Sequence, residues 1–228
     1  NYTLPVNDGD NGQFLKTDGS GVLSWAAAGG AASAAGANYQ IQYYADGVLG
    51  ASANFAYNTT NPAINLNSER ILANTSGGYN IFLGESGNFT MTGGSNFLAG
   101  YQAGYSNASG SNDIFLGYQA GYTNYDGQYN NFIGYKAGYS HYTSNSNDFF
   151  GNLTGYSHYS GERNLFMGSG AGYSNIYGSG DVFIGPDAGY YETGSNKLFI
   201  DNQQRSSEAD GRVKALVYGI FDADPANQ

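Results

Sequence analysis

Aromatic and hydrogen-bonding side chains recur next to one another in this sequence, at a spacing of 17 residues. One column of the repeat holds Asn or His, and the column after it holds Tyr in three successive coils, between Ala108 and Ile176. Exposed tyrosines flanked by polar groups suit sugars, because sugar rings stack on aromatic faces while their hydroxyls take directional hydrogen bonds. We therefore predict glycan contacts at Asn124, Tyr125, Asp126, His141, Tyr142, His158 and Tyr159. The alternative is a structural ladder in which the tyrosine rings stack on one another.

The residue types that catalysis or metal binding would need are sparse. His141 and His158 are the only histidines, and no Ser, Asp or Glu pattern places a nucleophile or an orienting acid beside them. Asp148 and Glu162 form a conceivable carboxylate pair for a depolymerase, but neither is repeated. Histidines from several chains could collect an ion, yet the Asp- and Gly-rich repeat of calcium-binding β-rolls is missing. The sequence predicts no enzyme, no metal and no other cofactor.

A regular repeat must position these columns. One glycine column recurs every 17 residues from Gly100 to Gly185, and a second recurs from Gly104 to Gly189. A coil of this length suits a β-solenoid with two strands of about five residues and two short turns, and such coils stack about 4.8 Å apart. The sequence thus predicts an all-β fold, a repetitive β-solenoid (β-roll) of about seven 17-residue coils.

Two apolar columns stand side by side in the repeat. Successive strand side chains point to opposite faces, so the two columns cannot share one interior. An exposed apolar stripe several coils long would be an aggregation surface, and a copy of the same chain is the plainest cover for it. The chain is therefore expected to form an oligomer. The first column is Phe115, Phe132, Phe149, Phe166 and Phe183, and the second is Leu116, Ile133, Phe150, Met167 and Ile184.

Further columns are predicted to hold the coils together. Asn or Asp recurs at one corner, where the side chains can hydrogen-bond along the stack, from Asp113 to Asp181. An Ala column marks a tightly packed position, and the tyrosines after the second Gly are expected to pack between coils.

Composition and charge narrow the class of protein. With 36 Gly, 22 Tyr, 13 Phe and 11% charged residues, the chain is too aromatic for disorder and too Gly-rich for helices. A net charge of −10 argues against nucleic acid or an anionic membrane as partner. The sequence contains no apolar run long enough to predict direct membrane insertion, and the absence of Cys excludes disulfides.

The regions flanking the repeats predict further modules. Residues 1–30 are expected to form a β-hairpin connector with strands QFLKT and VLSWA, and residues 31–77 a small β shaft module. The solenoid is predicted over residues 78–200. Residues 201–228, with the strand candidate ALVYGIFD, are expected to be a β connector to a further module.

Three phrases carry a resemblance. NxFIGYxAGY, GQFLKTDGSGVLSW and QIQYYADGVLGASANFAYNTTNPAINL resemble modules of phage tail-fibre and bacterial trimeric fibre proteins, and the paired apolar columns are similar to YadA-like adhesin heads. The 17-residue period departs from the shorter repeat of those heads. The resemblance implies an extracellular parallel homotrimer on a bacterial surface or a virion tail, with Leu116, Ile133, Phe150, Met167 and Ile184 at the threefold axis.

Two functions from different classes remain open. One is an attachment fibre that recognises a cell-surface glycan or protein receptor, and the other is a passive shaft that holds a distal tip. An ice-binding solenoid is a more distant third. The spacers SNASGSND, TNYDGQYN and SHYTSNSN differ from one another, and this diversity favours recognition, since a mere rod has no reason to vary its turns.

Overall fold

A computed structural model gives the fold. It describes residues 3–7, 13–27, 40–45, 48–58, 63–66, 69–73, 78–88 and 90–222. The chain divides into two compact units, Asn1–Tyr57 and Asn58–Gln228. The module ends proposed above at residues 30, 77 and 200 stay predictions.

The first unit contains two antiparallel strand pairs. Strands β1 (Gln13–Thr17) and β2 (Leu23–Ala27) pair as the sequence predicted. The turn between them is held by Asp18, whose Oδ1 accepts hydrogen bonds from the backbone N–H groups of Ser20 (2.8 Å) and Val22 (3.1 Å). Strands β3 (Gln40–Ala45) and β4 (Val48–Asn58) also pair.

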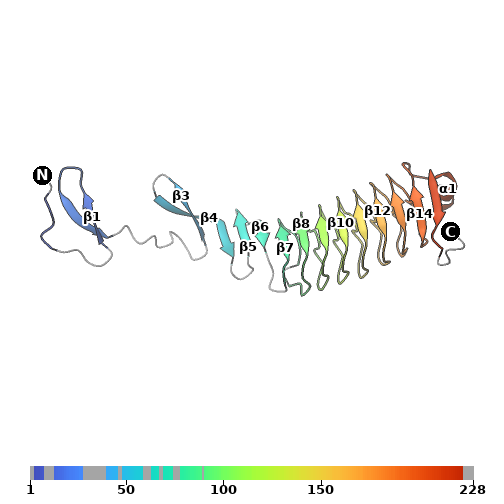
Figure 1. Cartoon of the computed structure of the whole chain (residues 1–228), viewed down its shortest axis with the longest axis horizontal. Helices are drawn as coiled ribbons and strands as arrows, with labels where there is room; N and C mark the ends of the chain where they lie inside the picture. Colours follow the sequence, from blue (N-terminus) through green and yellow to red (C-terminus); the bar gives the residue numbers. More distant parts are fainter. Residues whose placement is uncertain are drawn as a thin grey trace. The chain divides into compact units, whose positions relative to one another are not determined.

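The second unit is a β-solenoid in which successive coils lie side by side (Figure 1). It opens with two antiparallel strands, β5 (Ala63–Leu66) and β6 (Glu69–Ala73). The next strand pairs antiparallel with β6, and every later coil then adds one strand parallel to the strand before it. These strands are β7 (Ile81–Leu83), β8 (Phe97–Ala99), β9 (Ile114–Leu116), β10 (Asn131–Ile133), β11 (Asp148–Phe150), β12 (Leu165–Met167), β13 (Val182–Ile184) and β14 (Lys197–Ile200). The predicted solenoid of about seven 17-residue coils is confirmed.

The internal layout of a coil differs from the prediction. Each described coil from β7 to β13 has one strand of three residues, not two strands of about five. The reason lies in the segment after the first Gly, where positive φ values at Gln119 (54°) and Gly121 (59°) curl the chain into tight turns. These turns still hydrogen-bond from coil to coil, as between the N–H of Gly121 and the carbonyl of Ala137 (2.9 Å).

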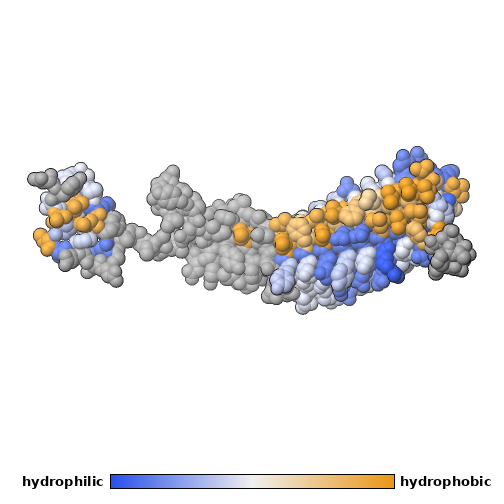
Figure 2. Space-filling view, in the orientation of Figure 1, coloured by the Kyte–Doolittle hydropathy of each residue, from blue (hydrophilic) through white to orange (hydrophobic). Residues whose placement is uncertain are grey.

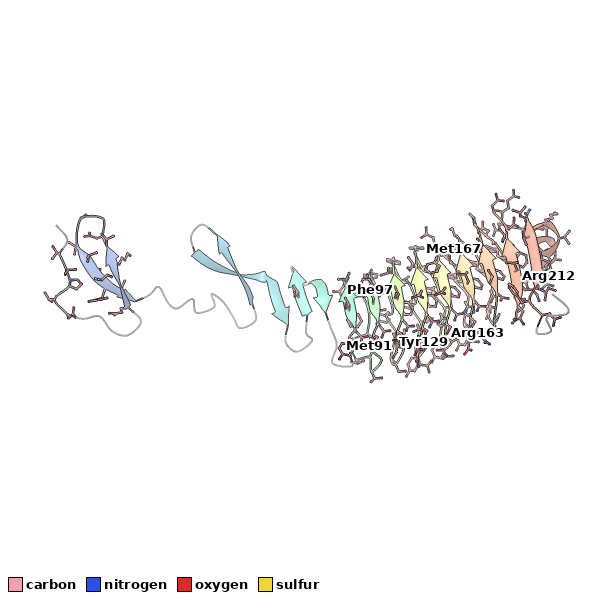
Figure 3. All side chains as sticks on the ribbon, viewed as in Figure 1. Met91, Phe97, Tyr129, Arg163, Met167 and Arg212 are labelled. Carbon is pink, nitrogen blue, oxygen red and sulfur yellow. The ribbon has the colours of Figure 1, made fainter. Side chains whose placement is uncertain are left out.

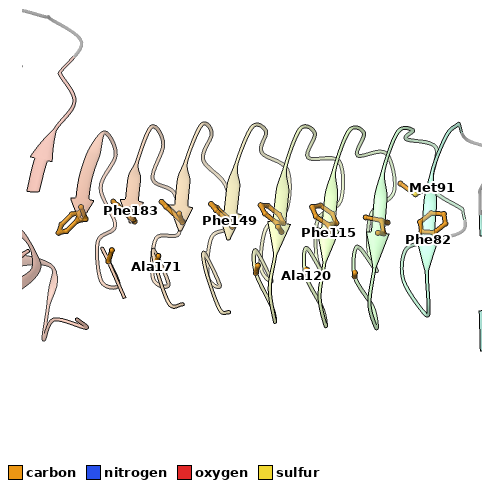
Figure 4. Close-up of a cluster of buried hydrophobic side chains, with 14 residues drawn as sticks. Phe82, Met91, Phe115, Ala120, Phe149, Ala171 and Phe183 are labelled. Atoms are coloured by element: carbon orange, nitrogen blue, oxygen red, sulfur yellow. The ribbon is translucent and has the colours of Figure 1, made fainter. Parts of the chain in front are cut away.

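The interior is built from columns one residue wide. The middle residue of each three-residue strand is completely buried, and it is Phe in every coil except that of Leu98. Figure 4 shows these rings in a row along the axis. From Phe115 to Phe183 the ring centroids lie 4.6–5.0 Å apart in parallel stacks. Each buried Phe contributes roughly 1.5–3 kcal/mol of transfer free energy. The Ala column, including Ala120 and Ala171, lies below the rings and is also fully buried, as predicted.

A polar ladder runs along one corner of the interior. Where this column holds Asn, its Oδ1 accepts hydrogen bonds from the next coil, as Asn147 Oδ1 does from the backbone N–H (3.2 Å) and the Nδ2 (3.0 Å) of Asn164. The Nδ2 also donates to a carbonyl of a turn, as from Asn164 to Gly178 (2.8 Å). The predicted corner ladder is therefore present, and it satisfies polar groups that burial would otherwise make costly.

The last coil is closed by a helix and a returning strand. Helix α1 (Glu208–Lys214) begins at Ser207, whose hydroxyl accepts a hydrogen bond from the N–H of Asp210 (3.1 Å). Strand β15 (Val217–Ile220) pairs antiparallel with β14, and its Tyr218 packs on Phe199 at the end of the Phe column. The strand was expected. The helix was not, and the Ser-x-x-Asp spacing at its start was the signal for it.

Candidate functional site

An apolar stripe covers the outer face of the solenoid sheet. The two side chains that flank each buried Phe point outward, so they form two columns along the axis. Figure 2 shows this stripe as an orange band along the solenoid, and in Figure 3 the stripe residues Phe97 and Met167 lie on the side opposite Tyr129 and Arg163. One column is Leu116, Ile133, Phe150, Met167 and Ile184, the residues predicted at the threefold axis.

The exposure of this column agrees with the sequence argument. Ile133 and Met167 are exposed, at 36% and 45%, while Leu116, Phe150 and Ile184 are half-buried by their neighbours. The Phe column and the second apolar column therefore occupy opposite faces of the strands, as predicted. The stripe has one polar interruption, because Asn131 Nδ2 donates to Asp148 Oδ1 (2.6 Å) within the second outward column.

Three residues predicted to contact a glycan are inside the protein. The side chains of Asn124, His141 and His158 are fully buried. Their column follows the two glycines and turns inward toward the Phe rings, and both histidines meet those rings edge-on, as His141 meets Phe132 at 4.9 Å. The expectation that these three side chains are exposed is wrong, and a bound sugar has no access to them in this fold.

The His141 ring is held in one tautomer by its neighbours. Its Nε2 accepts hydrogen bonds from Ser144 Oγ (2.8 Å) and Asn147 Nδ2 (3.2 Å), so the proton sits on Nδ1 and is donated to Asn124 Oδ1 (3.0 Å). Burial lowers the pKa of His141 well below its usual value, and the adjacent His158 lowers it further. His141 is therefore neutral around physiological pH.

His158 is less well satisfied. Its Nε2 accepts a hydrogen bond from Asn164 Nδ2 (3.0 Å), but its Nδ1 has no partner within the described residues. The preceding coil offers the ring of His141, stacked at 5.6 Å, where an Asn would supply an amide oxygen. Burial lowers the pKa of His158 to about 4, although a contact with the Gly178 carbonyl acts in the opposite direction.

Two carboxyl groups stand in the interior polar ladder. Burial raises the pKa of Asp113 to about 7, against the opposing effect of hydrogen bonds from Asn130, Asn107 and Asn124. Burial likewise raises the pKa of Asp181 to about 7. The sequence analysis placed both Asp side chains at this corner, but a pattern of residue types does not show how far the corner is shielded from water.

The tyrosines predicted to bind a glycan form a ladder on the flank. Tyr125, Tyr142 and Tyr159 are exposed, at 47%, 37% and 45%. Their rings stack on one another with centroids 5.6 and 5.4 Å apart and interplanar angles of 23° and 12°. The ring faces are therefore turned toward neighbouring rings, and the edges and phenol hydroxyls are left for a partner. This is the ladder arrangement that the sequence left open, and Asp126 lies exposed beside it.

A shallow groove of about 510 Å³ lies along this ladder. Serine and threonine hydroxyls from successive coils line it together with the three rings. The complete lining is Ser106, Thr123, Tyr125, Ser140, Tyr142 and Tyr159. The sequence argument named the tyrosines and missed the hydroxyl column, although a Ser or Thr follows each second-Gly tyrosine from Tyr105 to Tyr173.

A second tyrosine ladder follows the second glycine of each coil. Its six rings, from Tyr105 to Tyr190, stack with centroids 4.8–5.3 Å apart and interplanar angles of at most 7°. The prediction that these rings pack between coils agrees with this geometry. Lys136 Nζ lies over Tyr139 of this ladder, at 5.1 Å from the ring centroid.

No protein-family model, curated protein or solved structure matches this chain. Among the residues that the structure describes, no group of three or more His, Asp or Glu side chains is placed to hold a metal ion. None of the helical segments in that same part of the chain has the length and apolarity to cross a membrane.

Proposed function

We propose that the chain is a segment of an extracellular trimeric fibre that attaches to a cell surface through a glycan or protein receptor. The observation that supports this most is the column of outward apolar side chains from Leu116 to Ile184, which no polar residue interrupts. Such a row has no use on a free monomer, because water would contact it over every coil. Three parallel copies that turn this face inward would cover it and produce a stiff fibre.

Replacing Ile133 with Asp is expected to break the trimer. The change puts a charge in the middle of the stripe, and an unpaired carboxylate at an apolar interface costs several kcal/mol. Light scattering at micromolar concentration measures the assembly. The matched control is Ile176→Asp, since Ile176 is similarly exposed, at 39%, but lies in the spacer rather than in a solenoid strand. A folded wild-type monomer, or a trimer that survives Ile133→Asp, would refute this interface.

Attachment is proposed to use the solenoid flank. The spacers vary in sequence, whereas the Phe column from Phe115 to Phe183 and the first Gly column do not, and the groove beside Tyr125, Tyr142 and Tyr159 is lined by spacer residues. One shallow groove would bind weakly. Three copies on one fibre would strengthen attachment to a dense receptor, on the order of 10² or more, by avidity.

Replacing Tyr125, Tyr142 and Tyr159 together with Ser is expected to reduce attachment to cells that bind the wild-type protein. The variant loses the ring edges and reshapes the groove, while the buried Phe column is untouched. Attachment is measured by fluorescence of the labelled protein, after light scattering and a melting curve have confirmed assembly. Unchanged attachment by a folded trimer would exclude the groove.

The second candidate function is a passive shaft. The tyrosine rings use their faces on one another, which a purely structural ladder also explains. A shaft would assemble through the same stripe and would show no loss in the tyrosine variant. The attachment measurement therefore separates the two functions, while the Ile133 experiment tests what they share.

A further inference from the structure

The groove on the flank has a chemistry that selects among receptors. Its six lining side chains are uncharged, and they come from successive coils, so hydroxyl groups repeat along the solenoid axis. The hydroxyls of Ser106 and Ser140, and those of the three groove tyrosines, make no hydrogen bond to another described residue. Each is free to donate to or accept from a ligand. Thr123 differs, because its Oγ1 lies 2.8 Å from the carbonyl of Tyr139 and 2.9 Å from that of His141.

An extended peptide does not fit this groove. A peptide that adds as a strand needs unpaired backbone groups. The backbone N–H of every lining residue already donates to the next coil, for example from Tyr125 to Tyr142 (2.8 Å) and from Ser140 to Tyr156 (3.1 Å). The lining also offers no charged side chain to hold a charged ligand. What remains is a neutral ligand that bonds through hydroxyls.

The spacing of the groups adds a second constraint. The ring centroids of the ladder are 5.6 and 5.4 Å apart, so the phenol hydroxyls recur once per coil. A linear polysaccharide in an extended conformation presents its hydroxyls at a similar interval, one set per sugar. A ligand that lies along the axis could therefore repeat the same contact on each coil, and its affinity would grow with its length.

We propose that the groove binds a linear, uncharged polysaccharide chain laid parallel to the solenoid axis, through hydroxyl-to-hydroxyl hydrogen bonds rather than through stacking on ring faces. The proposal rests on the attachment function and narrows it to a ligand class and a binding mode. The ring faces are occupied by neighbouring rings, so the phenol oxygens carry the recognition. A terminal sugar of a branched glycan would gain nothing from the repeat.

The test is an array of immobilised linear oligosaccharides of increasing length, prepared from neutral polysaccharides such as cellulose, mannan, starch and dextran. Monosaccharides, branched glycans and charged fragments of hyaluronan and alginate share the array. The wild-type protein is expected to bind at least one neutral series with a signal that rises with chain length. Preference for charged fragments, binding without length dependence, or no bound neutral series would overturn the proposal.

Two variants test the binding mode. Replacing Tyr125, Tyr142 and Tyr159 with Phe keeps the stacked rings and removes only the hydroxyls, and it is expected to weaken binding at least about tenfold. Replacing Ser106 and Ser140 with Ala should weaken it in the same direction. The matched control is Tyr122, Tyr139 and Tyr156 to Phe, in the neighbouring ladder outside the groove. Full binding by the groove Phe variant would show that ring stacking, not hydroxyl bonding, carries the contact.

The array result is read beside attachment to cells by the same preparation. Attachment without oligosaccharide binding would refute this ligand while leaving the attachment function in place. Loss of both would refute the function itself.

Discussion

The effect of replacing Asp113 with Asn on the free energy of unfolding is expected to be about 4 kcal/mol more favourable at pH 8 than at pH 4. Burial raises the pKa of Asp113 from 3.8 to about 7 in the folded protein. Each unit of pKa difference corresponds to about 1.4 kcal/mol. The folded state therefore holds its proton more tightly than the unfolded state, and stability falls as the pH rises from about 4 to 7.

Asn is the natural replacement at this position. The same column holds Asn130, Asn147 and Asn164 in the next coils, and an Asn Oδ1 at position 113 would keep the bonds that Asp113 Oδ1 accepts from Asn130. Its Nδ2 would stand where Asp113 Oδ2 accepts from Asn107 (3.3 Å) and Asn124 (3.4 Å), a pH-independent loss that the comparison between two pH values removes. The control is Asp126→Asn, which removes the same formal charge from an exposed side chain. Urea unfolding across this pH range measures the difference between each variant and the wild type. A gain from Asp113→Asn that is the same at pH 4 and pH 8 would contradict a buried, protonated carboxyl.

The buried histidines act in the opposite direction. Burial lowers the pKa of His158 to about 4, so the unfolded state binds the proton more tightly and stability falls as the pH drops below about 6.5. Between about pH 4 and 6.5, the effects of the histidines and of the buried aspartates oppose one another. In the Asp113→Asn variant the histidine contribution is less opposed, so this variant should lose more stability on acidification than the wild type does.

Replacing Gly134 with Ala is expected to destabilise the solenoid by about 3 kcal/mol or more, because a methyl group there meets the next coil. A Cβ on Gly134 would lie 2.3 Å from the carbonyl oxygen of Gly151, and the backbone has φ of +142°. The contacted atoms of Gly151 belong to the backbone and not to a flexible side chain, so the two coils would have to separate. Overpacking costs roughly 1–3 kcal/mol, and a non-Gly residue at this φ adds about 1–3 kcal/mol of backbone strain.

The matched control is Gly84→Ala. Gly84 occupies the equivalent place after β7, with φ of +73°, and a Cβ there would meet nothing within 4 Å. This variant should lose only the conformational part, about 1–2 kcal/mol. Denaturant unfolding of both variants gives the comparison. A loss for Gly134→Ala no larger than that for Gly84→Ala would contradict a clash between the coils.

The sequence predicted the solenoid because its period is carried by many residues at once. The Phe, Gly, Ala and Asn columns each repeat every 17 residues, so the stacking of coils and the opposite orientation of Phe132 and Ile133 followed from geometry alone. The second strand predicted in each coil is absent from the described coils, because residues such as Gln119 adopt a left-handed conformation that their residue type does not indicate. Helix α1 occurs once, so no repeat could reveal it.

The candidate site was predicted less well, for a related reason. A repeating column shows that its residues occupy equivalent positions. In a strand, successive side chains point to opposite faces, but a turn has no such alternation from which the direction of a side chain can be predicted. Asn124 and His141 therefore looked like surface groups beside Tyr125, and they are interior groups. Ser106 and Ser140 are a common residue type in turns. Their recurrence alone therefore did not indicate that their hydroxyls line a groove.

The parallel stacking of coils sets how this protein would respond to tension. The hydrogen bonds between coils run along the solenoid axis, as from Tyr142 to Tyr159, and the chain enters at one end of the stack and leaves at the other. A pull along the axis would load these bonds a few at a time, so that coils peel from an end in succession rather than shear together. Each released coil of 17 residues would yield about 60 Å of extended chain. A fibre made this way would lengthen stepwise under load and dissipate energy before it breaks.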